Sequence, residues 1–174
     1  MRVADYITDF LFKNGIKTSF MLSGTGSVFL DDAFANYAGM SYVSARHESA
    51  AVMMAVGYYK LSQKPGVALV TTGPGGANAV GGVVEAWVDS VPTIIISGQV
   101  ESKFLDKDLR YFGVQGLNIL PIIKPITKFS KTITDPYSIQ YYLDKALYFA
   151  LEGRPGPVWL DIPFDIQSAK ITDH

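Results

Sequence analysis

One carboxylate, Glu48, stands where a predicted strand ends and an almost wholly apolar helix begins. The chain reads SARHE over residues 44–48 and continues as SAAVMMAVGY over 49–58. A negative charge in the first turn of a helix is explained by the helix dipole alone. Apolar neighbours would also desolvate this carboxylate in part, which suits proton exchange with a ligand. Both interpretations of Glu48 stay open at this point, and His47 is expected to be a packed or hydrogen-bonded histidine.

Two glycine-containing loops follow other predicted strands. Residues 23–27 read SGTGS, but the third glycine of a dinucleotide-binding fingerprint would fall at Phe29, so the fingerprint fails. The alternative is a tight turn whose backbone angles require glycine. Residues 71–78 read TTGPGGAN and would let a ligand approach the backbone at a helix N-terminus. This second loop lacks the lysine and threonine of a phosphate-binding P-loop.

The composition excludes several other kinds of site. The 174 residues include no cysteine and two histidines, which excludes disulfides, a thiol nucleophile, Cys-ligated zinc and a His-based metal cluster. A net charge of −1 without any basic run argues against nucleic-acid binding. Asp5 and Asp9 interrupt the first apolar residues and no apolar run is long enough to span a membrane, so we expect a soluble, cytoplasmic protein. The low charged fraction, 18%, hints that a partner covers part of the surface.

The elements that position these loops alternate between helical and strand patterns. The spacing of apolar residues predicts helices over 3–11, 28–37, 48–61, 78–88 and 136–151, and strands over 18–22, 41–45, 66–72, 93–97 and 157–162. Strands that are apolar on both faces and alternate with helices predict an α/β fold, an open doubly wound parallel sheet with helices on both faces in a single domain. Ligands bind at the carboxyl ends of such strands, which selects the loops 23–27, 45–48, 72–78 and 98–116.

Five segments, in order along nearly the whole chain, resemble the N-terminal pyrimidine-binding (PYR) domain of thiamine diphosphate (ThDP) enzymes. Residues 46–48 (RHE) with their Ala-rich helix resemble the activating-glutamate segment, and residues 72–78 (TGPGGAN) resemble the family's T-[ST]-G-P-G-x-x-N loop. Residues 89–100, with DSVP and GQV, resemble the acetolactate synthase-like branch. Residues 124–128 (KPITK) and 153–163 (GRPGPVWLDIP) complete the series.

The resemblance implies that Glu48 activates the cofactor. In this family a glutamate hydrogen-bonds N1′ of the aminopyrimidine and thereby promotes formation of the C2 carbanion. The family's cofactor-facing loops map onto Gly24 and Thr25, and onto Gly73, Pro74, Gly75 and Asn78; a family glutamine on the substrate side maps onto Gln115. The implied activity is that of an acetolactate synthase-like transferase or of a lyase that decarboxylates a 2-oxo acid.

Two loops depart from this branch, and two motifs are missing. Acetolactate synthases usually have Pro-Gly-Gly where residues 23–25 read SGT, and Phe-Gln-Glu where residues 114–116 read VQG. Both loops approach the acceptor in the family, so the resemblance does not identify the donor or the acceptor. The family binds the diphosphate and Mg²⁺ through Gly-Asp-Gly and paired asparagines of a diphosphate-binding (PP) domain, and neither motif occurs in this sequence.

The resemblance therefore implies half of a cofactor site. We expect residues 1–174 to be a PYR domain that faces the PP domain of another subunit in a homodimer or homotetramer, and to be inactive alone; FAD is left open. The chain would be the N-terminal part of a longer enzyme or the small subunit of a two-chain decarboxylase. A non-catalytic assembly or regulatory domain would keep the same fold. A nucleotide-binding Rossmann domain would bind NAD(P)H, and we expect no such binding.

Overall fold

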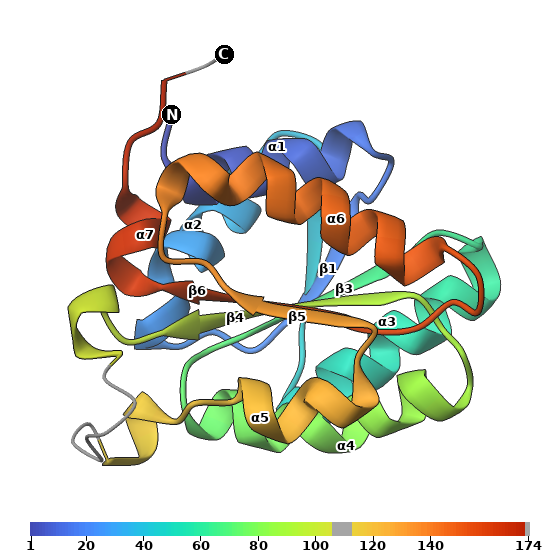
Figure 1. The fold of residues 1–174 in the computed structure, drawn as a ribbon. Helices are drawn as coiled ribbons and strands as arrows, with labels where there is room; N and C mark the ends of the chain where they lie inside the picture. The colour runs from blue at the N-terminus through green and yellow to red at the C-terminus, as the bar shows by residue number, and fades with distance from the viewer. Residues whose placement is uncertain (106–112, 173–174) are drawn as a thin grey trace.

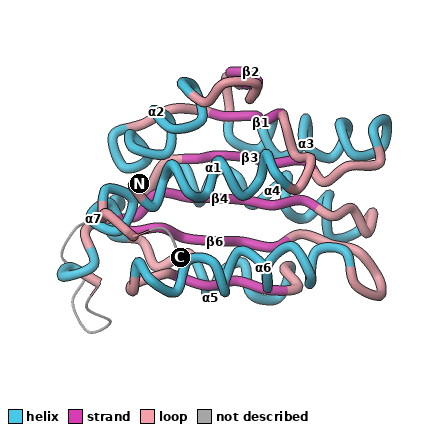
Figure 2. The backbone as a smooth tube through the Cα atoms, turned by 90° about the horizontal axis from the view of Figure 1, so that it is seen from above, coloured by secondary structure: helices cyan, strands magenta, loops and turns pink. Residues whose placement is uncertain are grey.

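The sheet has six strands, all parallel, in the order β2-β1-β3-β4-β6-β5 (Figures 1 and 2). The computed structural model describes residues 1–105 and 113–172. This architecture confirms the predicted open parallel sheet. The strands are β1 (Thr18–Met21), β2 (Ser41–Ser44), β3 (Gly66–Val70), β4 (Thr93–Gln99), β5 (Phe129–Thr132) and β6 (Val158–Pro163).

Helices cover both faces of this sheet, as Figure 1 shows. One layer contains α1 (Val3–Lys13), α2 (Val28–Asn36), α6 (Ile139–Leu151) and α7 (Phe164–Ser168); the other contains α3 (Glu48–Ser62), α4 (Pro74–Val88) and α5 (Leu120–Ile123). Successive residues of β4 enter different cores: Ile94 and Ile96 pack with the first layer, and Ile95 packs with the second. None of the described helices combines the length and apolarity needed to cross a bilayer.

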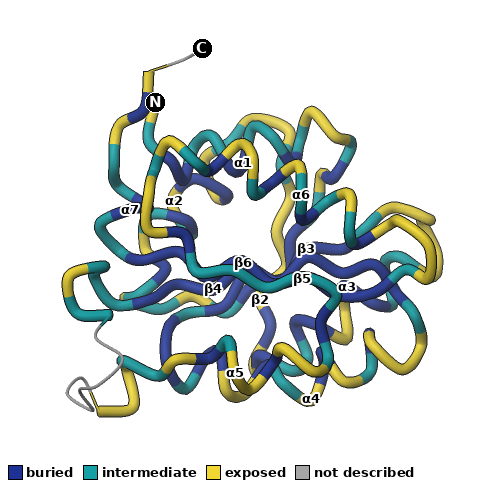
Figure 3. Tube along the Cα trace, viewed as in Figure 1, coloured by how far each residue is buried: buried dark blue, intermediate teal, exposed yellow. Residues whose placement is uncertain are grey.

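Burial on both faces holds for the central strands but not for β2. Every residue of β3, β4 and β6 is buried, whereas all four residues of β2 are exposed (Figure 3). The reason is position, because β2 forms one edge of the sheet and pairs only with β1. An apolar run in the sequence does not reveal which strand lies at an edge.

The boundaries of several elements differ from those predicted. Helix α4 begins at Pro74, four residues before the predicted start, because a proline at the first helical position has a suitable φ and no N–H to satisfy. The predicted helix over 136–151 is a 3₁₀ turn, Pro136–Ser138, followed by α6. The short elements β5, α5 and α7 were not predicted.

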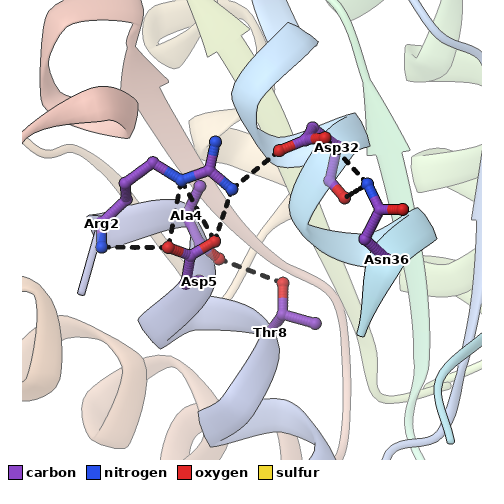
Figure 4. Close-up of polar contacts among 6 residues, drawn as sticks. All are labelled: Arg2, Ala4, Asp5, Thr8, Asp32 and Asn36. Atoms are coloured by element: carbon purple, nitrogen blue, oxygen red, sulfur yellow. Dashed lines mark hydrogen bonds and ion pairs between the residues drawn. The ribbon is translucent and has the colours of Figure 1, made fainter. Parts of the chain in front are cut away.

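The two ends of the described chain are paired with each other. The Val3 N–H donates to the Ala169 carbonyl at 2.9 Å, and the Ile171 N–H donates to the Met1 carbonyl at 3.0 Å. Arg2 secures this region, since its guanidinium donates to Asp5 at 2.6 Å and to Asp32 at 2.7 Å (Figure 4). The chain thus enters and leaves the fold at one place, beside α1 and α2.

Candidate active site

The loops after β1 and β3 meet at the carboxyl edge of the sheet. Strand β1 lies between β2 and β3, so the connections from β1 and from β3 lead to opposite faces, which is where open α/β sheets bind ligands. A Cβ on Gly24 would lie 2.6 Å from the Cβ of Thr71, and one on Gly26 would collide with Thr72. The backbone of Gly24 is extended, with φ −166°, so the expectation that backbone angles require this glycine is wrong. Close approach of the two loops requires it.

Glu48 is the first residue of α3, and its side chain is only 7% exposed. The amide of Asn78 on α4 donates to Glu48 Oε2 at 3.1 Å. The hydroxyl of Ser49 donates to the Asn78 carbonyl at 2.5 Å, which links α3 to α4 a second time. His47 caps α3, since its Nδ1 accepts the Ser49 N–H at 3.2 Å. The prediction of a hydrogen-bonded histidine is confirmed.

The second oxygen of Glu48 faces the start of α4. A Cβ on Gly75 would lie 3.6 Å from Glu48 Oε1 and 2.8 Å from Thr71 Cγ2. Within residues 1–105 and 113–172, no hydrogen bond to Oε1 accompanies the one to Oε2. Glycine at position 75 therefore places no side chain beside Oε1, and this oxygen can accept a hydrogen bond from a ligand.

Gly73 brings the long loop to the same place. It precedes α4 with φ +60° and ψ −109°, a conformation that favours glycine, and a Cβ there would lie 2.8 Å from Gln115 Cα. The neighbouring Thr72 hydroxyl donates to the Gln115 carbonyl at 2.8 Å. The structure thus anchors Gln115 through its backbone to the loop after β3.

A cavity of about 450 Å³ opens between the loops that follow four strands. Its walls include Thr25 after β1, Thr71 and Thr72 after β3, Gln99 at the end of β4, Gln115, and Phe164 after β6. Of the predicted site residues, Thr25 and Gln115 line this cavity. The other six predicted site residues do not line it and form the adjoining corner around Glu48: Gly24, Glu48, Gly73, Pro74, Gly75 and Asn78. Thr71 separates the two groups, because it lines the cavity and also abuts Gly24 and Gly75.

A buried polar network behind this cavity was missed by the sequence analysis. Asp161 on β6 is 1% exposed and accepts hydrogen bonds from Ser97 at 2.6 Å, Thr132 at 3.0 Å and Gln99 at 3.2 Å. Burial raises the pKa of Asp161 to about 6, although the three hydrogen bonds oppose this shift. The signal that could have found it is a polar residue inside the apolar run 157–162.

A second carboxylate holds the loop after β1. Asp31 on α2 accepts the Gly24 N–H at 3.2 Å and the Ser27 hydroxyl at 3.0 Å. Burial raises the pKa of Asp31 to about 6 as well. Helix α2 therefore holds the cavity wall that carries Thr25, through the hydrogen bonds that Asp31 accepts.

Comparison with known proteins places this geometry in a family. Residues 1–122 match the family described as thiamine pyrophosphate enzyme, N-terminal TPP binding domain. The chain is 38% identical over 159 residues to the acetolactate synthase large subunit of Lactococcus lactis subsp. lactis (strain IL1403), covering 91% of the chain and 27% of that protein. It is 40% identical over 162 residues to the large subunit of Haemophilus influenzae (strain ATCC 51907 / DSM 11121 / KW20 / Rd), covering 93% and 28%.

A plant relative gives the same result. The chain is 35% identical over 164 residues to the chloroplastic acetolactate synthase of Arabidopsis thaliana, covering 94% of the chain and 24% of that protein. The chain thus spans about a quarter of the length of the curated relatives that it matches. Because residues 1–122 match this family and the relatives align along nearly the whole chain, the chain belongs to the thiamine pyrophosphate enzymes. It corresponds to their N-terminal TPP binding domain.

Proposed function

We propose that this chain supplies the pyrimidine half of a ThDP site in which Glu48 exchanges a proton with the aminopyrimidine. The observation that carries the proposal is the setting of Glu48: it is 7% exposed, its Oε2 is held by Asn78, and its Oε1 lies beside Gly75. A buried carboxylate with one oxygen fixed and the other available suits a hydrogen bond to a ring nitrogen. When bound, the cofactor would supply the carbanion chemistry.

The residues around Glu48 fit a flat aromatic ring. Gly75 places no side chain beside Glu48 Oε1, Gly73 lets residues 114–115 pack against the loop, and Pro74 begins α4 without a backbone N–H. Asn78 orients the carboxylate from one side and is itself anchored by Ser49. Together these residues would position the pyrimidine, keep water from Glu48 and hold the transferable proton at Oε1.

The rest of the cofactor needs protein that this chain lacks. Apolar side chains of α3 and α4 stay exposed, among them Met53 (44%), Val84 and Val88 (64%). The two helices contact each other, and we propose that these side chains form one surface. We propose that the PP domain of another subunit covers this surface in a homodimer or homotetramer and holds the diphosphate with Mg²⁺.

We propose further that residues 1–174 form one domain of a longer enzyme acting on a 2-oxo acid, as an acetolactate synthase-like transferase or a decarboxylase. The support is that three relatives named acetolactate synthases match along 91–94% of this chain, which spans 24–28% of their length. Gln115 and Thr25 line the cavity beside the proposed pyrimidine site, where a substrate would meet the cofactor.

The deciding experiment measures exchange of the C2 proton of bound ThDP in the full enzyme carrying Glu48→Gln. We expect exchange to slow by about 100-fold or more, because the amide cannot accept and return the proton. A matched control is Glu85→Gln, which makes the same change on the neighbouring helix α4 and should leave exchange unaltered. Exchange in Glu48→Gln as fast as in the unmodified enzyme would overturn the proposal.

The half-site is tested separately with the 174-residue chain alone. We expect it to bind ThDP weakly and to turn over no substrate, because its sequence has neither Gly-Asp-Gly nor paired asparagines to hold the diphosphate. A micromolar dissociation constant, measured by calorimetry, would contradict the division of the site between two domains.

A further inference from the structure

The buried network around Asp161 ends at the wall of the cavity. Gln99 connects the two, because its Nε2 donates to Asp161 at 3.2 Å and to the Leu117 carbonyl at 3.0 Å. Its Oε1 accepts the Val100 N–H at 2.9 Å and lies 3.2 Å from the Thr72 hydroxyl. Gln99 is 2% exposed, so water does not replace these partners.

The orientation of the Gln99 side chain is determined by its partners. If the carboxamide were reversed, Oε1 would face the carboxylate of Asp161 and the carbonyl of Leu117, and Nε2 would face the Val100 N–H. Oε1 would then face two other acceptors, and Nε2 would face another donor. Asp161 enforces the observed orientation because an ionised carboxylate only accepts hydrogen bonds.

We propose that Asp161 is a positioning residue for the cavity: it fixes the Gln99 carboxamide, which holds the segment 115–117 against the loop after β3. Thr72 joins the same wall, since its hydroxyl reaches both the Gln115 carbonyl and Gln99 Oε1. The link to catalysis rests on the proposed function, because this wall adjoins the Glu48 corner through Thr71 and Gly73. The positioning itself is a property of the chain without cofactor.

The register of the sheet puts Asp161 in this place. Ser97 on β4 and Thr132 on β5 are its direct cross-strand partners, and each donates a hydrogen bond to it. Ser97 in turn accepts the indole N–H of Trp159 at 2.8 Å. All three of these donors to Asp161 are neutral side chains, so within residues 1–105 and 113–172 the carboxylate has no ion-pair partner to explain its burial.

A buried carboxylate without a counter-charge is a poor stabiliser of a fold. Replacing Asp161 with an apolar residue would nevertheless leave the donors of Ser97, Gln99 and Thr132 without their acceptor in the interior, which destabilises the fold. A purely structural role therefore predicts that Asp161→Leu lowers the stability of the whole domain and speeds exchange of its buried amides to a similar extent. A positioning role predicts that the same variant folds but loses the order of Gln99.

The test is amide hydrogen exchange of the 174-residue chain by NMR, without ThDP, at pH 7.5. The reporter is the Val100 N–H, whose acceptor is Gln99 Oε1. We expect Asp161→Leu to speed exchange of this amide about 10-fold and to shift the resonances of Gln115 and Leu117. Asp161→Asn keeps an oxygen that can face Gln99, so it should restore exchange to within about threefold of the unmodified chain.

The control variant is Thr132→Val, which removes another donor to Asp161 and leaves Gln99 in place. It should change Val100 exchange by less than about twofold. Unaltered exchange in Asp161→Leu, or equal acceleration in the Leu and Asn variants, would overturn the proposal. Should the Leu variant not fold, Asp161→Ala carries the same expectation with less bulk. Because no cofactor is present, these outcomes are independent of the test on Glu48.

Discussion

Two buried carboxylates lie near the same edge of the sheet, and they differ in how fully they are hydrogen-bonded. Counting partners in the described part of the chain, Asp161 is 1% exposed and accepts three hydrogen bonds, whereas Glu48 is 7% exposed and accepts one. A carboxylate with its oxygens satisfied by the fold organises its neighbours. One with an oxygen left available beside a glycine is suited to a ligand. The contrast separates the residue proposed to meet the cofactor from the residue proposed to shape the cavity.

The largest expected effect concerns Asp161 and pH. Its folded-state pKa of about 6 lies above the ordinary 3.8, so the folded chain binds more protons than the unfolded chain between these values. Stability from this group is therefore present below pH 4 and is lost as pH rises through 6. Relative to Asp161→Asn, the free energy of unfolding of the unmodified chain should fall by about 2.4 kcal/mol from pH 4 to pH 7.

Urea denaturation at several pH values measures this difference. Asp31, whose pKa burial also raises to about 6, is present in both proteins, so its contribution cancels. A difference between the two proteins that stays constant from pH 4 to pH 7 would show that Asp161 does not titrate in this range.

The next prediction, with smaller effects, compares the loss of a hydrogen-bond donor at each of the two carboxylates. Ser97→Ala removes a donor from Asp161 and strands the indole N–H of Trp159, so it should cost about 2 kcal/mol of unfolding free energy. Asn78→Ala removes the one hydrogen bond to Glu48 in a position nearer to solvent and should cost about 0.5 kcal/mol. Equal losses in thermal or urea unfolding would remove the distinction between the two sites.

The last comparison probes the space beside Glu48. Gly75→Ala gains helix propensity but places a Cβ 2.8 Å from Thr71 Cγ2, so we expect a net cost of about 1 kcal/mol. Gly57→Ala on α3 is the matched control: a Cβ there meets nothing within 4 Å, so the variant should gain about 0.5 kcal/mol. Stabilisation by both substitutions would mean that the corner around Glu48 tolerates a side chain.

The sequence predicted the sheet and one of the two carboxylates. Periodicity identified the long elements because an amphipathic helix and a buried strand each have a local pattern, and the segment around Glu48 was recognised from a motif. The five residues of α7 are too few to show a helical period, and β5 reads FSKT, with a single apolar residue. The position of β2 at an edge depends on strand order, which no local pattern records.

Asp161 was missed for a similar reason. Its partners Ser97, Gln99 and Thr132 lie 29 to 64 residues away in sequence and meet it only through the register of three strands. A lone aspartate in an apolar run gives no indication of them. The contribution of Thr71 was hidden as well, because its contacts with Gly24 and Gly75 arise from two loops that approach each other in space.

The pairing of residues 1–3 with 169–171 has a consequence for how the chain can be rearranged. Since the first and last described segments already touch, a short peptide could join them without moving either. New ends could then be opened at Gln63 and Lys64, which are exposed and follow α3. A circular permutant of this kind would keep the sheet, with the order of its strands along the chain changed and their order in space preserved.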